Sequence, residues 1–351
     1  MRDKMKKLLA LTLGLTLLAA CSPKEAEATP TPEATPAPTE EATPAPVFKG
    51  EHVNVSMLKG PTGLGAAKLM DEAANGETVN DYTFTVLADP TEAVAGLSRE
   101  EDPIDIAALP TNLASTLYHK LDGGVQLMAL NTLGVLYILE NGDTVNSLAD
   151  LAGKTICAYG QGANPEYVLN YLLEQNGVSA DDVTIEWKST SDEVTTLMAS
   201  GEIDLCMLPV PAATSVLMQN SDVRTAVDLT EAWEESGADG ALTMGCVVVR
   251  TAFAQEHPEA VNTFLEEYRE SISYMSSEDN LDDAAALAET YGIVPKAAVA
   301  KRALPDANLC FITGGDMIDN IQGYYQVLFR ADPASIGGSI PDGAFYYDYE
   351  S

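Results

Sequence analysis

The sequence predicts an α/β fold with two similar lobes, and three observations point to it. Short apolar, β-branched runs alternate with helical patterns, as expected for strands of a parallel sheet covered by helices on both faces. A long β-rich segment, 125–140, separates two such series. The segments IDIAALPTNLASTLY (104–118) and IDLCMLPVPAATSVL (203–217) also resemble each other. Unless this βα pattern recurs by chance, Pro110 and Pro209 occupy equivalent places in the two lobes.

The expected elements follow in order along the chain. The first series has strand-like runs at 53–58, 82–88 and 104–110, and the second series has runs at 154–160, 183–189 and 203–209. Each run precedes a helical pattern, which after the first run begins near Leu64. The strand-like segment 241–250 is followed by amphipathic helices at 257–275 and 282–292. We expect the aromatic C-terminal segments to pack onto the core of the first lobe, with a docking surface as the alternative.

The N-terminus has the pattern of an export signal. Residues 1–20 contain four basic residues, an apolar stretch from Leu8 to Leu18 and two alanines before Cys21. The sequence LAAC (18–21) resembles the lipobox of bacterial lipoproteins, which implies that Cys21 is lipidated and anchors the chain to the extracytoplasmic face of the cell membrane. The alternative is an ordinary cleavage site that happens to precede a cysteine.

Composition defines a tether and excludes one class of partner. Residues 21–48 consist largely of Pro, Thr, Ala and Glu, which predicts a disordered linker after the lipidated cysteine. The formal net charge of the chain is −34, and it becomes −37 once residues 1–20, which carry +3, are removed. Since phosphate binding requires clustered Lys and Arg, we expect no nucleic-acid partner.

Cysteine and histidine give no support for metal or triad chemistry, and no cofactor is expected. Four cysteines lie inside apolar runs at wide spacings: Cys157, Cys206, Cys246 and Cys310. Buried free thiols are the favoured interpretation, although an exported chain also permits a disulfide. The three histidines are scattered: His52, His119 and His257.

The glycine-rich segment KGPTGLGAAK (59–68) is not a nucleotide-binding motif. A P-loop requires Lys directly after its second glycine, but Ala66 follows Gly65. A dinucleotide fingerprint starting at Gly63 would require Gly at the position of Lys68. What remains is a helix N-terminus with free backbone N–H groups, where Thr62 could serve as N-cap or hydroxyl donor.

Taken together, these features resemble a known protein family. The signal, the tether, the loop KGPTGLG, the paired ID-x-x-x-LP turns and the segment LADLAGKTICAYGQGANPEYVLNYLL (148–173) are similar to bacterial solute-binding lipoproteins of ABC importers. The closest branch is the SsuA/THI5-like (NMT1) group of sulfonate, nitrate and thiamine-pyrimidine binders. The resemblance implies a type II periplasmic-binding-protein fold, with two α/β lobes joined by two crossing strands around a ligand cleft. Lobe 1 would comprise 49–138 and 242–351, and lobe 2 would comprise 139–241.

The ligand is expected where the carboxyl ends of the strands face the cleft. The candidates from the first lobe are Lys59, Gly60, Pro61, Thr62, Gly63, Pro110, Thr111, Asn112 and Thr132, with Asn131 beside them. The candidates from the second lobe and its crossing are Tyr159, Gln161, Gly162, Ala163, Pro209 and Met244, with Gly160 and Asn164 in the same turn.

Thr62, Thr111 and Gln161 are the preferred hydroxyl or amide partners of the ligand. Tyr159 either stacks on a flat ligand or only covers its strand end, and Gly160 and Gly162 either approach the ligand or only satisfy turn geometry. Lys59 is the only cation in these loops. The ligand is therefore an anion held mainly by helix N-termini and neutral donors, or a neutral or cationic heterocycle such as a pyrimidine.

The resemblance implies capture without catalysis. A monomer would bind a small molecule, close by hinge bending and deliver it to an ABC permease driven by its ATPase. One alternative is an enzyme like the THI5 proteins that synthesise the thiamine pyrimidine, although their cysteine-rich motif has no counterpart in this sequence. The other alternative is the ligand-binding subunit of a surface sensor.

Overall fold

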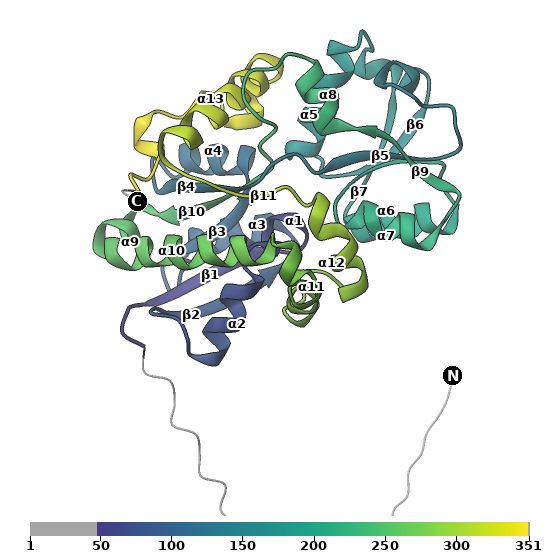
Figure 1. Cartoon of the computed structure of the whole chain (residues 1–351). Helices are drawn as coiled ribbons and strands as arrows, with labels where there is room; N and C mark the ends of the chain where they lie inside the picture. Colours follow the sequence, from purple (N-terminus) through teal and green to yellow (C-terminus); the bar gives the residue numbers. More distant parts are fainter. Residues whose placement is uncertain (1–47, 350–351) are drawn as a thin grey trace, which may run out of the picture. The chain divides into compact units, whose positions relative to one another are not determined.

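The computed structural model describes residues 48–349, which contain two β-sheets and the helices that cover them (Figure 1). The predicted signal peptide (1–20), the lipidated Cys21 and nearly all of the linker lie outside the described residues. Within 48–349, no helix is both long enough and apolar enough to cross a membrane.

The first sheet has six strands in the order β11-β4-β10-β3-β1-β2. Their bounds are β1 His52–Leu58, β2 Asp81–Leu87, β3 Ile106–Pro110, β4 Val125–Thr132, β10 Gly245–Arg250 and β11 Leu309–Ile312. The helices that accompany this sheet are α1 Pro61–Leu64, α2 Ala67–Asn75, α3 Pro90–Leu97, α4 Thr111–Lys120, α9 Thr251–Glu256, α10 Pro258–Met275, α11 Leu281–Thr290, α12 Ala297–Ala303 and α13 Gly314–Ala331. Short 3-10 turns in this part are η3 Glu278–Asn280, η4 Leu304–Asp306, η5 Pro333–Ile336 and η6 Gly343–Phe345.

The second sheet has five strands in the order β7-β6-β8-β5-β9. Their bounds are β5 Leu136–Asn141, β6 Thr155–Tyr159, β7 Thr184–Lys188, β8 Leu205–Pro209 and β9 Val223–Asp228. The helical elements of this part are α5 Asn164–Gln175, α6 Ser191–Ser200, α7 Ala212–Gln219, α8 Leu229–Glu235, η1 Leu148–Leu151 and η2 Ala180–Asp182.

The two sheets share one plan, which confirms the internal similarity expected from the sequence. In each, the first strand lies between the second and the third: β1 between β2 and β3, and β6 between β7 and β8, all parallel. Pro110 ends β3 and Pro209 ends β8, so the two prolines do occupy equivalent places. Their partners across the sheet are Gly245 and Leu136.

The strands of the two βα series are parallel as the sequence predicts, whereas the two strands that cross between the sheets are antiparallel to their neighbours. β10 runs antiparallel to β3 and β4, and β5 runs antiparallel to β8 and β9. The physical reason is the chain path, because each of these strands arrives from the other sheet and therefore enters against the direction of its neighbours. The long strand expected at 125–140 is likewise two strands, since β4 belongs to the first sheet and β5 to the second.

The lobe limits expected at 138/139 and 241/242 remain a proposal. The chain leaves the first sheet after Thr132 and joins the second at Leu136, and it returns between α8 and β10. The first passage is held by the last part of the chain, because Leu133 donates its N–H to the carbonyl of Asn308 at 3.1 Å and the Asn308 amide donates to the carbonyl of Gly134.

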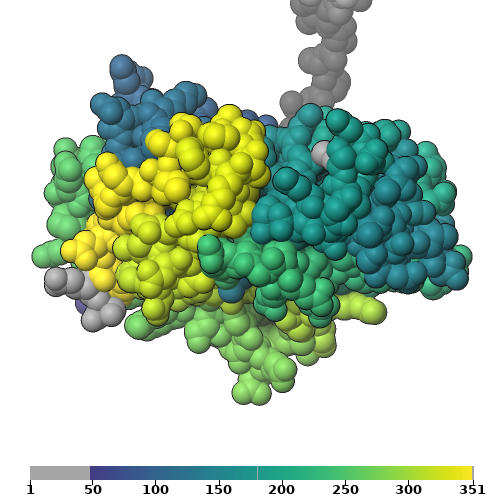
Figure 2. All heavy atoms as spheres, turned by 90° about the horizontal axis from the view of Figure 1, so that it is seen from above, coloured from purple at the N-terminus to yellow at the C-terminus, as the bar shows by residue number. Residues whose placement is uncertain are grey.

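Helix α13 packs against helices of the second sheet. Gly323 of α13 lies so close to Asp239 and Gly240 that a Cβ at this glycine would meet their backbone atoms at 2.7 Å. The rings of Trp233 and Tyr324 lie 5.5 Å apart. Figure 2 shows the yellow C-terminal segment directly against teal and green residues of the second lobe. Tyr324 is fully buried, so this aromatic segment packs in the core as expected, although it reaches across to the second lobe as well.

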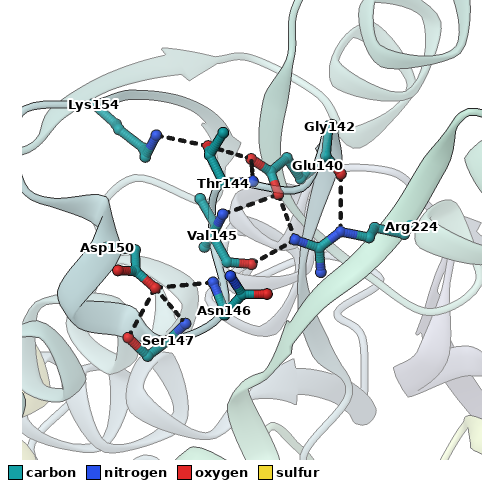
Figure 3. A network of polar contacts seen from close by, with 9 residues as sticks. All are labelled: Glu140, Gly142, Thr144, Val145, Asn146, Ser147, Asp150, Lys154 and Arg224. Carbon is teal, nitrogen blue, oxygen red and sulfur yellow. Dashed lines mark hydrogen bonds and ion pairs between the residues drawn. The ribbon is translucent and has the colours of Figure 1, made fainter.

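A buried carboxylate fastens strands β5 and β9 together (Figure 3). Glu140 accepts hydrogen bonds from the backbone N–H groups of Thr144 and Val145, and its Oε2 lies 2.6 Å from Nη2 of Arg224 on β9. Arg224 also donates to the carbonyls of Gly142 and Val145. The turn after β5 is thereby fixed by side chains.

Candidate functional site

The loop after β1 is held in place by a buried asparagine. Asn131 donates from Nδ2 to the carbonyl of Thr62 at 3.1 Å and to the hydroxyl of Tyr268 at 3.0 Å. Gly245 lies against the same place, because a Cβ there would be 2.7 Å from Thr62 Cγ2 and 2.6 Å from Asn131 Oδ1. The loop therefore rests directly on the crossing strand β10.

Two details of this loop correct the sequence interpretation. The helix does not begin near Leu64, because α1 begins at Pro61 and α2 follows at Ala67. Thr62 is not the N-cap, since Gly60 holds that position without a side-chain cap. The physical reason is that proline suits the first turn of a helix, while the preceding residue has φ +90°, which glycine adopts readily.

The turn after β6 is shaped by glycine and by one carboxylate. Gly160 and Gly162 have φ of +96° and +74°, so turn geometry alone explains both glycines. Glu166 accepts the N–H of Gly162 at 2.6 Å and fixes the turn from the first turn of α5. Ala163 is the N-cap of α5 and offers no side-chain cap. Asn164 is the first helical residue, and its amide does not cap its own helix.

Asn164 instead joins the two sheets. Its Nδ2 donates to Thr111 Oγ1 at 2.9 Å and to the carbonyl of Met244 at 2.8 Å. Its Oδ1 accepts the N–H of Asn112 at 3.3 Å and the hydroxyl of Tyr324 at 2.9 Å. Only 1% of Asn164 is exposed, so these bonds form where water is excluded.

The partners of Asn164 are themselves fixed within the first lobe. Thr111 donates its hydroxyl to the carbonyl of Thr243 at 2.6 Å, and its own carbonyl accepts the hydroxyl of Tyr325 at 2.7 Å. Asn112 donates from Nδ2 to the carbonyl of Ser335 at 3.2 Å and, more weakly, to that of Gly162 at 3.5 Å. Within residues 48–349, the buried Oδ1 of Asn112 has no hydrogen-bond partner.

Tyr159 lies at the end of β6 and is partly exposed. Burial raises the pKa of its phenol, and the charge of Asp89 raises this pKa further. Asp89 caps α3 by accepting the N–H of Thr91 at 2.8 Å. At neutral pH the Tyr159 hydroxyl is therefore protonated and able to donate a hydrogen bond to a ligand.

The predicted site residues differ in accessibility. Five are buried: Gly63, Thr111, Asn112, Thr132 and Met244. Seven are partly exposed: Gly60, Pro61, Thr62, Pro110, Tyr159, Ala163 and Pro209. Three are exposed: Lys59, Gln161 and Gly162.

The structure brings Thr111, Asn112, Met244 and Gly162 together around Asn164. It places Thr62 and Thr132 beside Gly245. In the part of the chain that the structure describes, no side-chain hydrogen bond joins Lys59 or Gln161 to another predicted residue. These two side chains are thus available to a ligand.

Sequence reasoning missed the α13 contribution and undervalued Asn164. Tyr324 and Tyr325 lie in an aromatic segment for which the sequence predicts only packing onto the core. No local pattern indicates that their hydroxyls form hydrogen bonds with the strand-end residues. Asn164 stands directly before Pro165 at a helix start, which normally indicates a capping role. Among the described residues, no group of three or more His, Cys, Asp and Glu side chains is arranged to hold a metal ion.

Comparison with known proteins confirms the family resemblance. Residues 123–280 match the model of a family described as NMT1/THI5 like. This stretch includes β4, the first passage between the sheets, the whole second sheet, β10 and α10. The comparison with curated protein sequences found no match.

Solved structures confirm the two-lobed periplasmic-binding-protein fold. An ABC transporter protein from Parabacteroides distasonis is similar with a TM-score of 0.69 at 21% identity, over 85% of this chain and 99% of that one. The periplasmic aliphatic sulphonate binding protein SsuA from Escherichia coli gives 0.64 at 16% identity, over 81% and 94%. The alkanesulfonate-binding protein SsuA from Xanthomonas axonopodis pv. citri, bound to MOPS, gives 0.63 at 17% identity, over 84% and 96%. At these identities the likeness establishes the fold.

Proposed function

We propose that this protein is an extracytoplasmic solute-binding lipoprotein that captures a small molecule between its lobes and delivers it to an ABC importer. The observation that carries the proposal is the contact between strand-end residues of two equivalent sheets, Thr111 and Asn112 from one and Asn164 from the other. In open α/β sheets such strand ends bind ligands. Here the two sets of strand ends meet, as required for a ligand enclosed from both sides.

The proposed ligand is an organic sulfonate or similar small anion. Lys59 is exposed beside the loop, and the positive end of the α4 dipole favours negative charge, although the N–H groups of Thr111 and Asn112 are engaged by Met244 and Asn164 in this structure. Two of the similar structures are proteins described as binding sulfonates. A flat heterocycle held by Tyr159 is the competing ligand class, because that phenol is partly exposed and protonated.

We assign ligand contact first to the accessible members of the predicted set: Lys59, Thr62, Tyr159 and Gln161. Thr111, Asn112, Thr132 and Met244 are buried and engaged with the chain itself. They contact a ligand only if it displaces these bonds. The protein performs no chemistry on the ligand in this proposal, and Lys59 and the helix starts act by charge and hydrogen bonding.

In this proposal, delivery uses a lipid-anchored protein and a membrane partner. Lipid on Cys21 would hold the body at the extracytoplasmic face of the membrane, with the residues after it as a tether. The closed monomer would dock to a permease whose cytoplasmic ATPase drives import. Metabolic labelling with a radioactive fatty acid tests the anchor, since Cys21→Ser should abolish incorporation.

Binding is tested by thermal shift and calorimetry on the chain from residue 22 onward, which keeps every described residue. The panel contains taurine, ethanesulfonate, MOPS, nitrate, hydroxymethylpyrimidine and thiamine. A ligand at about one hundred times its dissociation constant adds about 2.7 kcal/mol of stability, a readily measured rise in melting temperature. If a sulfonate binds, Lys59→Gln should weaken its binding. Lys120→Gln, a matched change of an exposed lysine at the far end of α4, should leave the affinity unchanged. Binding of the pyrimidines alone would reject the anion assignment.

A further inference from the structure

Asn164 has the contacts of a latch between the lobes. It belongs to α5, whose preceding strand β6 lies in the second sheet, yet all four of its hydrogen-bond partners belong to elements that accompany the first: Thr111, Asn112, Met244 and Tyr324. Met244 is fixed to the first sheet, because its N–H donates to the carbonyl of Thr132 at 3.0 Å. The Asn164 side chain therefore spans the boundary between two bodies.

We propose that Asn164 is a positioning residue that holds the two lobes closed in the absence of ligand. Its amide uses both of its ends: the oxygen accepts the N–H of Asn112 in the first turn of α4, and the nitrogen donates to groups fixed by β3 and β10. The oxygen thus occupies a helix start that otherwise attracts a ligand. Any opening that separates α5 from α4 must break these three bonds together.

The geometry excludes a purely local role. A helix-starting asparagine commonly caps its own helix, but Ala163 is the N-cap here and the Asn164 amide makes none of the capping bonds. The turn before it is already fixed by Glu166, which accepts the Gly162 N–H at 2.6 Å. The Asn164 side chain is thus free to be used across the boundary.

The inference rests on the proposed closure of the lobes, and its test requires no ligand. Cysteines introduced at Glu92 of α3 and Asp192 of α6, both exposed and both in the first turn of a helix that follows a strand end, carry spin labels on the two lobes. Pulsed electron–electron double resonance then gives the distribution of distances between the two spin labels, and thus between the lobes. The protein without these two cysteines, treated identically, reports any labelling of the native thiols.

The ligand-free wild type should give one dominant short distance. Asn164→Ala should add a longer one. The variant loses three bonds across the boundary, and since one net hydrogen bond alone is worth about a factor of ten, the ratio of open to closed protein should rise at least about tenfold. Asn170→Ala, a change on the same helix at a side chain that makes no hydrogen bond to the first lobe within the described residues, should leave the distribution unchanged.

Two outcomes would overturn the proposal. One is an unchanged distribution in Asn164→Ala, and the other is equal broadening in both variants, which would indicate general loosening of α5. Thr111→Val replaces Asn164→Ala if the latter does not fold. It removes the hydroxyl that accepts the Asn164 amide and donates to the carbonyl of Thr243, and only the first of these bonds crosses the boundary and bears on opening. Failure of every ligand in the binding panel would reject the proposed function without altering this result.

Discussion

Glu140 and Arg224 form a buried ion pair whose loss should destabilise the second lobe (Figure 3). The Glu140 side chain is 6% exposed and accepts hydrogen bonds from Arg224, from the N–H and hydroxyl of Thr144 and from the N–H of Val145. Glu140→Gln retains the shape of the side chain, but it replaces one carboxylate oxygen, which accepts hydrogen bonds, by an NH2 group that can only donate and that faces other donors. Breaking a buried pair costs about 3–5 kcal/mol. Because the Arg224 side chain is 35% exposed, water compensates part of this, and we expect about 2–4 kcal/mol.

Urea unfolding followed by tryptophan fluorescence measures this loss, since both tryptophans, Trp187 and Trp233, lie in the second lobe. Glu174→Gln, an exposed change on α5, is the control. The reasoning is refuted if Glu140→Gln unfolds at the same urea concentration as Glu174→Gln.

The same pair predicts a pH dependence. Burial alone raises the pKa of Glu140, but hydrogen bonds from Thr144 and Val145 and the charge of Arg224 outweigh it, and the net pKa lies below the usual value. A carboxyl whose pKa is lowered by folding stabilises the protein above its unfolded pKa of about 4.3 and loses this effect as pH falls through the folded pKa. The stability difference between wild type and Glu140→Gln should therefore be constant from pH 7 to pH 5 and shrink below about pH 4. A difference that grows on acidification would contradict this assignment.

Three further changes test the core and the site. Gly245→Ala would place a Cβ 2.6 Å from Asn131 Oδ1 and 2.7 Å from Thr62 Cγ2. This overpacking should lower the free energy of unfolding by about 1–3 kcal/mol, as measured by urea unfolding. An unchanged unfolding midpoint would show that the loop moves to accommodate the methyl group. Trp233→Phe removes the bond from Nε1 to the carbonyl of Gly240 at 3.0 Å and should cost about 1 kcal/mol in the same assay, whereas a stabilised variant would contradict the role given to this bond. Burial raises the pKa of all four described cysteine thiols. In the folded protein at pH 8 they should therefore resist alkylation by iodoacetamide, and in urea they should react, as measured by mass spectrometry. Fast alkylation of the folded protein would contradict this prediction.

The part of the fold that depends on local pattern could be predicted from the sequence. Strand–turn–helix alternation and the two ID-x-x-x-LP turns correctly placed Pro110 and Pro209 at equivalent strand ends. The direction of β5 and β10 could not be predicted in the same way. Their alternation and apolar content fit either direction, and only the pairing of Leu136 with Pro209 and of Gly245 with Pro110 sets it.

The loops of the candidate site could be predicted from the sequence, but the contacts among their residues could not. The loops after β1, β3 and β6 follow from strand ends, and their glycines from turn geometry. The contacts of Asn164 depend on distant chain segments, since Thr111 is 53 residues away and Tyr324 is 160 residues away. No local pattern encodes such pairs, because they form only after both sheets and α13 have packed.

The use of an amide at position 164 explains how a latch of this kind remains reversible. Its four hydrogen bonds join neutral groups, each with a net contribution of about 0.5–1.5 kcal/mol. Closure also leaves Asn112 Oδ1 buried without a partner among the described residues, at a cost of about 1–3 kcal/mol. The bonds therefore outweigh this cost by only a few kcal/mol. A carboxylate here would bond the start of α4 with a full charge and hold the lobes together far more strongly. With the neutral amide, modest differential contacts from a ligand, or from a permease that favours the open form, are enough to shift the equilibrium in either direction.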